Sequence, residues 1–141
     1  MKGSSVKSYT HILDTNIVSD LIRSPNGVIR EKIEALGVSA VCINIIIAAE
    51  IRFGCAKRGS PRLTKQANAI LAVLPIVPLE EPVDLVYGDV RQQLETQGQV
   101  IGPNDLLIAA HAKQLDLTLV TANEEEFKRV ADLRVENWLG E

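Results

Sequence analysis

The stretch His11-Ile12-Leu13-Asp14-Thr15-Asn16 is the starting point for predicting the fold, because an acidic residue directly follows a short apolar run. A short apolar run bounded by polar residues is typical of a buried strand, and we predict one from Tyr9 to Leu13. A helix is expected from Ile17 to Arg23, and the breaker cluster Ser24-Pro25-Asn26-Gly27 ends it. A strand that leads through a polar turn into a helix favours an α/β fold.

The rest of the chain alternates in the same way between short β-branched runs and longer segments with helical periodicity. No internal repeat or long linker interrupts this alternation. We therefore expect one domain over residues 1–141, with a central, mostly parallel sheet flanked by helices and with residues 1–8 disordered or a tag. The further helices are expected at 28–36, 44–57, 62–74, 83–98, 102–112 and 124–130, and the further strands at 38–43, 75–79, 117–121 and 134–138.

The composition suits a globular protein: 46% of the 141 residues are hydrophobic and 23% are charged. No apolar run reaches the roughly 18 residues that a membrane helix needs. The N-terminus lacks the apolar stretch of a secretory signal, and two cysteines are too few for a disulfide framework. The sequence therefore predicts a cytoplasmic protein with no membrane association.

The net charge of −3 argues against a domain that holds nucleic acid by bulk electrostatics, since such domains are usually basic. A nuclease of this charge would need metal ions, a basic partner or a local basic rim. Arg52, Lys57 and Arg58 belong to one predicted helix and are candidates for a rim that positions phosphates. Arg23, Arg30 and Lys32, which lie near Asp14 in the sequence, are further candidates. A solvated helix face is the ordinary interpretation of the same residues.

Three acids stand where their neighbours favour burial. Asp14 ends the first strand, Glu50 lies within an apolar helix, and Asp105 opens the most apolar helix of the chain. Ligands of open parallel sheets bind beyond the carboxyl ends of the strands, so we expect these acids to converge there. A hard divalent cation with oxygen ligands would offset their repulsion, and Mg²⁺ or Mn²⁺ fits because no His or Cys cluster offers a zinc site.

Each acid also has an ordinary structural interpretation. Asp14 could be a turn or cap residue, Asp105 a first-turn acid favoured by the helix dipole, and Glu50 a solvent-facing side chain. The functional interpretation rests on the three acids together.

Four motifs in order add to this interpretation, and they cover the chain from about Ile12 to Trp138. They are Leu13-Asp14-Thr15-Asn16, Ala49-Glu50-Ile51-Arg52-Phe53-Gly54, Gly102-Pro103-Asn104-Asp105 with the helix to Ala112, and Leu119-Val120-Thr121-Ala122-Asn123 with Glu126-Phe127, closing on Glu136-Asn137-Trp138. Together they resemble the PIN-domain toxins of the VapC type. Each motif alone is weak, but their order and spacing are specific.

The resemblance implies a PIN-like three-layer sandwich and an Mg²⁺- or Mn²⁺-dependent endoribonuclease that acts as a toxin on RNA, tRNA above all. It also implies a VapB-like antitoxin and a homodimer, for which the apolar faces at 28–36 and 70–74 are candidate contacts. Matched residue by residue, Asp14, Glu50 and Asp105 are the core acids that bind the metal. Thr15, Asn16 and Thr121 are the supporting polar residues.

One position departs from the family pattern. Many PIN domains have a fourth Asp after the Thr of the late strand, where this chain has Ala122 and Asn123. Glu126 is the better candidate for a fourth catalytic acid, although it also fits an exposed run of three glutamates. The number of metal ions is therefore left open.

Other classes fit less well. A response-regulator receiver domain needs paired acids after the first strand and a late Lys, and a haloacid-dehalogenase-type phosphatase needs an Asp where Asn16 stands. A PIN fold that binds RNA or protein without cleaving is the remaining alternative.

Overall fold

The computed structural model describes residues 8–140, so the expectation for residues 1–8 falls almost wholly outside the described residues. Within them lie five strands: β1 (His11–Leu13), β2 (Val41–Asn44), β3 (Ile76–Val77), β4 (Thr118–Val120) and β5 (Val135–Glu136). The α-helices of the described part are α1 (Thr15–Arg23), α2 (Val28–Leu36), α3 (Ile45–Arg58), α4 (Pro61–Val73), α5 (Val83–Thr96), α6 (Pro103–Gln114) and α7 (Glu124–Phe127).

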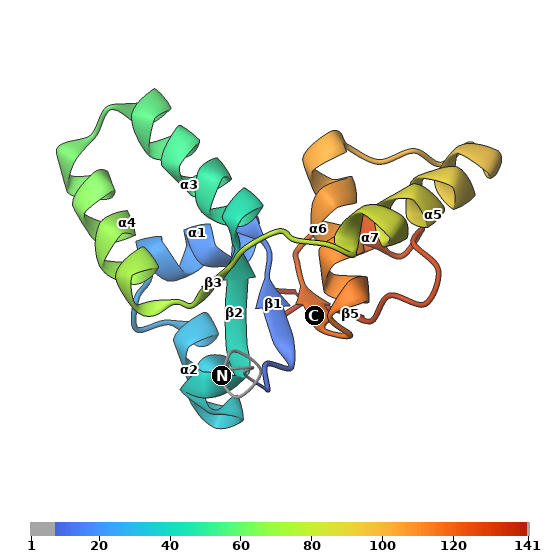
Figure 1. Ribbon diagram of the computed structural model, residues 1–141. Helices are drawn as coiled ribbons and strands as arrows, with labels where there is room; N and C mark the ends of the chain where they lie inside the picture. The colour runs from blue at the N-terminus through green and yellow to red at the C-terminus, as the bar shows by residue number, and fades with distance from the viewer. Residues whose placement is uncertain (1–7, 141) are drawn as a thin grey trace.

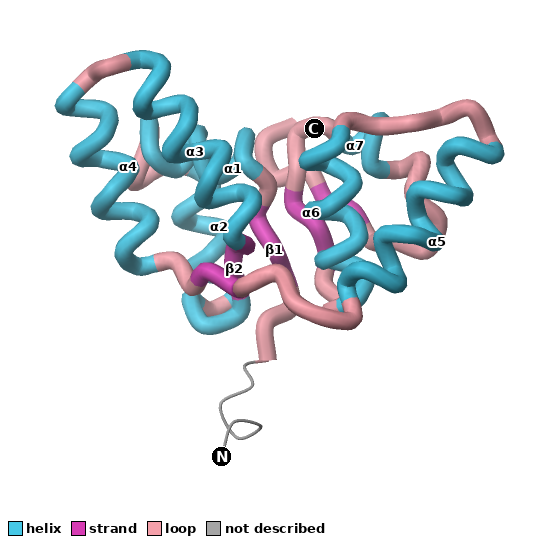
Figure 2. The backbone as a smooth tube through the Cα atoms, turned by 45° about the horizontal axis from the view of Figure 1, so that its top comes forward, coloured by secondary structure: helices cyan, strands magenta, loops and turns pink. Residues whose placement is uncertain are grey.

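The strands form one parallel sheet in the order β3-β2-β1-β4-β5. Helices α1, α3 and α4 lie on one side of the strands, and α5 and α6 lie on the other (Figures 1 and 2). This arrangement confirms the predicted α/β architecture with a central sheet between helices. Because all five strands are parallel, their carboxyl ends share one edge of the sheet, where ligands of such folds bind.

The core is aliphatic, as the scarcity of aromatic residues requires. Ile12 and Leu13 belong to β1, which lies between β2 and β4, and both are fully buried. Ile108 of α6 is also fully buried. Helix α6 is apolar on nearly every face because it packs against both α5 and the sheet. The helix that carries Asp105 is thus anchored over most of its surface.

The predicted strand 38–43 is wrong at its beginning. Val38–Ala40 (η2) forms a 3₁₀ turn, and the strand begins only at Val41, which pairs with His11. Gly37 has a positive φ of 106°, which turns the chain, and the Ala40 N–H donates to the Gly37 carbonyl at 2.9 Å. The apolar sequence is misleading here because the Val38 side chain is 69% exposed.

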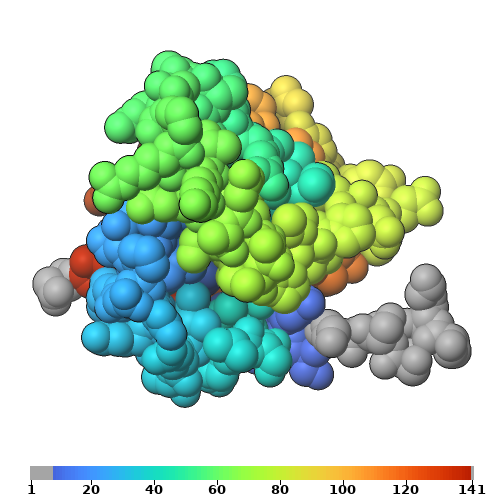
Figure 3. Space-filling view, turned by 90° about the vertical axis from the view of Figure 1, so that its left-hand side faces the viewer, coloured from blue at the N-terminus to red at the C-terminus, as the bar shows by residue number. Residues whose placement is uncertain are grey.

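Helices α2 and α4 both lie on the face shown in Figure 3, where α2 is blue to cyan and α4 is green. Ile33, Ile70 and Leu74 line one cavity of about 430 Å³ between them. The two apolar stretches suggested as dimer contacts therefore lie on the same surface.

Among residues 8–140, no helix has the length and apolarity to cross a bilayer.

Candidate active site

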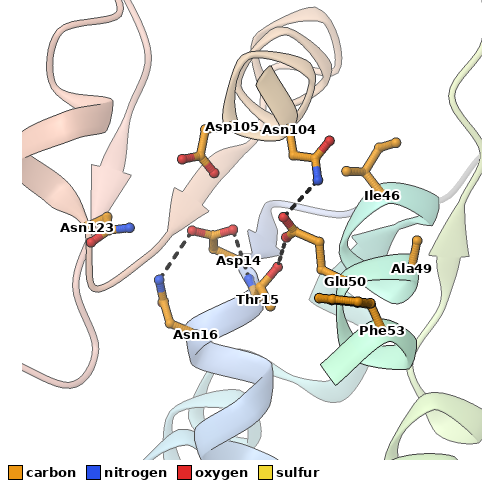
Figure 4. Close-up of a pocket in the computed structure, with 10 residues that line it drawn as sticks. All are labelled: Asp14, Thr15, Asn16, Ile46, Ala49, Glu50, Phe53, Asn104, Asp105 and Asn123. Atoms are coloured by element: carbon orange, nitrogen blue, oxygen red, sulfur yellow. Dashed lines mark hydrogen bonds between the residues drawn. The ribbon is translucent and has the colours of Figure 1, made fainter. Parts of the chain in front are cut away.

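Asp14, Glu50 and Asp105 line one open pocket of about 730 Å³, as their sequence positions predict (Figure 4). Asp14 follows β1, Glu50 is the sixth residue of α3, and Asp105 lies in the first turn of α6. The three side chains therefore come from elements that are far apart in sequence and adjacent at the carboxyl edge of the sheet.

The Asp14 carboxylate is 3% exposed and held from two directions. Its Oδ1 accepts from the Thr15 N–H at 2.8 Å, which caps α1, and its Oδ2 accepts from the Thr121 hydroxyl at 2.8 Å. Asn16 adds a longer contact to Oδ2 at 3.4 Å. Burial raises the pKa of Asp14 and outweighs these hydrogen bonds, which lower it. The polar residues expected from the family resemblance thus fix the Asp14 oxygens in place.

Glu50 is connected to both neighbouring helices. Its Oε1 accepts from the Thr15 hydroxyl, and its Oε2 accepts from the Asn104 side-chain amide at 3.1 Å. The sequence did not single out Asn104, although its place beside Asp105 at the start of α6 was an available signal. These two bonds orient the Glu50 carboxylate within the pocket.

Asp105 and Glu126 interact directly. Burial, followed by the charge of Glu126 and a side-chain hydrogen bond with it, raises the pKa of Asp105 to about 7, and Asp14 and Glu50 add to the effect. Glu126 Oε2 also accepts from the Gly102 N–H at 3.3 Å. Glu126 therefore lies beside Asp105, whereas Asn123 lines the pocket without a charge.

The acids share a pocket, but they do not form a complete coordination site for a metal ion. Across residues 8–140, no three His, Cys, Asp or Glu side chains are grouped closely enough to hold one ion as they stand. The pocket nevertheless offers carboxylate and amide oxygens, which are ligands for hard cations such as Mg²⁺ and Mn²⁺. Burial is the main cause of the raised pKa of Asp105, and the neighbouring acids Glu126, Asp14 and Glu50 add a repulsion that a cation would relieve. The donor set therefore fits a divalent cation.

The raised pKa of Asp105 predicts how the stability of the metal-free protein depends on pH. A carboxyl whose pKa is higher in the folded state contributes stability below its unfolded pKa and loses it as pH rises to about 7. Because Asp105 is partly exposed to solvent, we expect its ionisation to lower the free energy of unfolding by only about 1–2 kcal/mol as the pH rises from 4 to 8. Urea unfolding in EDTA should show the loss in the wild type and a smaller one in Asp105→Asn. Equal pH slopes would contradict the assigned cause.

The basic residues lie differently from the expected rim. Within the described residues, the lining of the acidic pocket includes no lysine or arginine. The Arg52 guanidinium donates to the Asn68 side chain, whereas Arg23 and Arg58 line an adjoining pocket that shares Glu50. Arg23 and Arg58 thus belong to the pocket beside the acidic pocket and not to the acidic pocket itself.

A buried pair connects two of the helices that carry acids. Asn44 ends β2 and caps α3, because its Oδ1 accepts from the Ile47 N–H at 2.9 Å. Its side-chain amide lies 3.1 Å from Nδ1 of His111 in α6, and both side chains are buried. His111 is thus a buried histidine with a hydrogen-bond partner. The pair joins the start of the Glu50 helix to the Asp105 helix.

Comparison with known proteins gives likenesses that extend over nearly the whole chain. Residues 11–133 match the family model of the PIN domain. Ribonuclease VapC2 of Rickettsia felis is 35% identical over 130 residues, which are 91% of this chain and 97% of the relative. The tRNA(fMet)-specific endonuclease VapC of Shigella flexneri is 31% identical over 128 residues, covering 90% of this chain and 96% of the relative. A chain in the crystal structure of VapBC2 from Rickettsia felis bound to a promoter DNA fragment superposes with a TM-score of 0.84 at 34% identity, covering 92% of this chain and 98% of that one.

Proposed function

The chain belongs to the PIN-domain family, and we propose that it is a metal-dependent endoribonuclease that acts as the toxin of a toxin–antitoxin pair. The observation that carries the proposal is the single pocket that brings Asp14, Glu50 and Asp105 together at the carboxyl edge of the sheet. Two relatives named as a ribonuclease and as a tRNA-specific endonuclease support RNA, and tRNA in particular, as the substrate.

Asp14, Asp105 and Glu50 would hold Mg²⁺ or Mn²⁺, with Glu126 beside Asp105. Such a cation supplies charge neutralisation and polarisation of a phosphoryl oxygen. The protein's own part is positioning: Thr121 and Thr15 fix Asp14, while Thr15 and Asn104 orient Glu50.

Asp105, with a pKa of about 7, can hold or release a proton near neutral pH in the metal-free site. The proposed reaction is hydrolysis of a backbone phosphodiester by water, which leaves a 5′-phosphate and a 3′-hydroxyl.

The proposed partners follow from the relatives. The crystal structures of VapBC2 from Rickettsia felis and of VapBC from Salmonella typhimurium, both bound to DNA, each contain a chain that resembles this one. We therefore propose a VapB-like antitoxin and a homodimeric toxin. A basic antitoxin side chain placed in the acidic pocket would neutralise its charge and block substrate.

Cleavage of purified RNA is the direct test. The protein, freed of metal with EDTA and supplied with a tRNA panel, should cleave only after Mg²⁺ or Mn²⁺ is added. Fragment ends should carry 5′-phosphates. RNA binding without cleavage at any metal concentration would instead favour the non-catalytic binding module.

A further inference from the structure

One face of α3 forms a wall of the acidic pocket. Ile46, Ala49, Glu50 and Phe53 line the pocket together (Figure 4), and their spacing of three, four and seven residues places them on one side of the helix. The wall is apolar except at Glu50, and Phe53 stands one turn beyond that acid. The pocket thus combines an acidic end with an aromatic side chain on the same helix.

Phe53 is 67% exposed, whereas the chain's other phenylalanine, Phe127, is fully buried. Single exposed apolar residues are common on protein surfaces, and Leu85 on α5 is 69% exposed although it does not line the acidic pocket. Exposure alone therefore carries no argument. Phe53 differs from Leu85 because it has a flat aromatic ring and lines the pocket that holds the acids.

We propose that Phe53 is a stacking platform for a nucleobase next to the phosphate that is cleaved; this inference rests on the proposed ribonuclease function. A nucleotide joins an anionic phosphate to a flat aromatic base, and the pocket joins a cation-binding acidic end to a flat aromatic side chain. Its volume of about 730 Å³ is typical of a small-molecule site. A base attached to a phosphate at the acids would lie against the α3 wall.

The chemistry of stacking defines the substrate class. Every base has a π face, so an aromatic platform binds bases with little preference among them. The base must be free of its own stack, which favours a nucleotide in a loop or single strand over one in a regular helix. Phe53 would therefore select unpaired RNA, while the base identity is left to other contacts.

The test is a double-mutant cycle in which the Phe53 side chain and one RNA base are removed separately and together. An RNA oligonucleotide cut by the wild type at a mapped bond is prepared intact and with an abasic residue on either side of that bond. Phe53→Ala should lower kcat/KM on the intact oligonucleotide roughly tenfold, mainly through KM, because one base–aromatic stack contributes on the order of 1–3 kcal/mol. Phe53→Trp should retain activity and Phe53→Leu should not. On one of the two abasic oligonucleotides, wild type and Phe53→Ala should be equal.

Leu85→Ala is the matched control, since it removes an equally exposed apolar side chain outside the acidic pocket, and it should change nothing. An unchanged kcat/KM for Phe53→Ala, or an equal loss on all three oligonucleotides, would overturn the proposal. So would a variant that cleaves RNA normally but loses affinity for its antitoxin, because Phe53 would then serve a protein contact.

A binding measurement separates this proposal from the proposed function. Fluorescence anisotropy with the Asp105→Asn protein, with and without Phe53→Ala, follows binding of a labelled single-stranded RNA oligonucleotide that is intact or carries one abasic residue at each position in turn, so that no mapped cleavage bond is needed. If the wild type cleaves no RNA, the ribonuclease assignment fails by itself. Coupling between Phe53 and one base in binding would still support the base subsite, and its absence would refute it.

Discussion

Asp105→Asn should reduce RNA cleavage by more than the ~100-fold that loss of a supporting partner near a metal typically causes. The substitution removes a charge from the crowded end of the pocket, where Asp105 interacts with Glu126, Asp14 and Glu50. It leaves the side-chain volume nearly unchanged, so the fold should persist. At pH 7 in EDTA, the variant should be at least as stable as the wild type, because one of several repelling carboxylates is gone. Initial cleavage rates and urea unfolding of the same preparations measure both effects.

The control for this substitution is Asp89→Asn. Asp89 is exposed on α5 and does not line the acidic pocket, so its neutralisation changes the net charge equally without touching the site. It should retain wild-type cleavage. An Asp105→Asn protein that cleaves RNA at the wild-type rate would exclude Asp105 from the catalytic machinery and would remove the main support for a metal at this edge of the sheet.

Asn44→Ala should lower the free energy of unfolding by about 2–4 kcal/mol. The substitution removes the cap of α3, which is typically worth ~1 kcal/mol, and leaves buried polar atoms of Ile47 and His111 without partners at about 1–3 kcal/mol. Asn44 is fully buried, so water cannot easily replace either bond. Chemical denaturation monitored by circular dichroism at pH 7.5 gives the value directly.

Asn44→Asp distinguishes the hydrogen bonds from mere packing. An aspartate can still cap α3, but it has no N–H to donate to Nδ1 of His111; it can only accept from an Nδ1–H, and it pairs most strongly with the protonated imidazole. In the wild type, burial lowers the pKa of His111, so its contribution to stability is present above its unfolded pKa and is lost as pH falls. The carboxylate should raise that pKa, and Asn44→Asp should therefore approach wild-type stability as pH falls from 8 to 6. A stability gap that is independent of pH would show that the Asn44–His111 bond is unimportant.

Loss of the Asn44–His111 hydrogen bond should also affect the positions of the acids in the pocket. Asn44 begins the helix of Glu50, and His111 lies on the helix of Asp105, so loss of their bond loosens the placement of one acid relative to the other. Neither residue lines the pocket. The structure thus separates acids that face the pocket from polar residues that hold those acids in place.

The α/β class, most elements and the edge of the sheet at which Asp14, Glu50 and Asp105 meet could be predicted from the amino-acid sequence alone. These features depend on local signals: helical or alternating periodicity, breaker residues, and the Asn44 cap, all readable within a few residues. The convergence of the acids followed because parallel strands end at one edge. The segment Val38–Ala40, predicted as the beginning of a strand, resembles a strand in composition and turns because of the backbone at Gly37. The predicted strands 75–79 and 134–138 and the predicted helix 124–130 are also longer than β3, β5 and α7.

The contacts between side chains of different elements could not be predicted from the sequence and became visible in the folded structure. It brought Asn104 to Glu50, His111 to Asn44 and Glu126 to Asp105, over sequence separations of 54, 67 and 21 residues. It also turned Phe53 toward the acids and Arg52 toward α4. The physical reason is that periodicity assigns a residue to a face of its own helix, whereas its partner depends on how separate helices pack against the sheet.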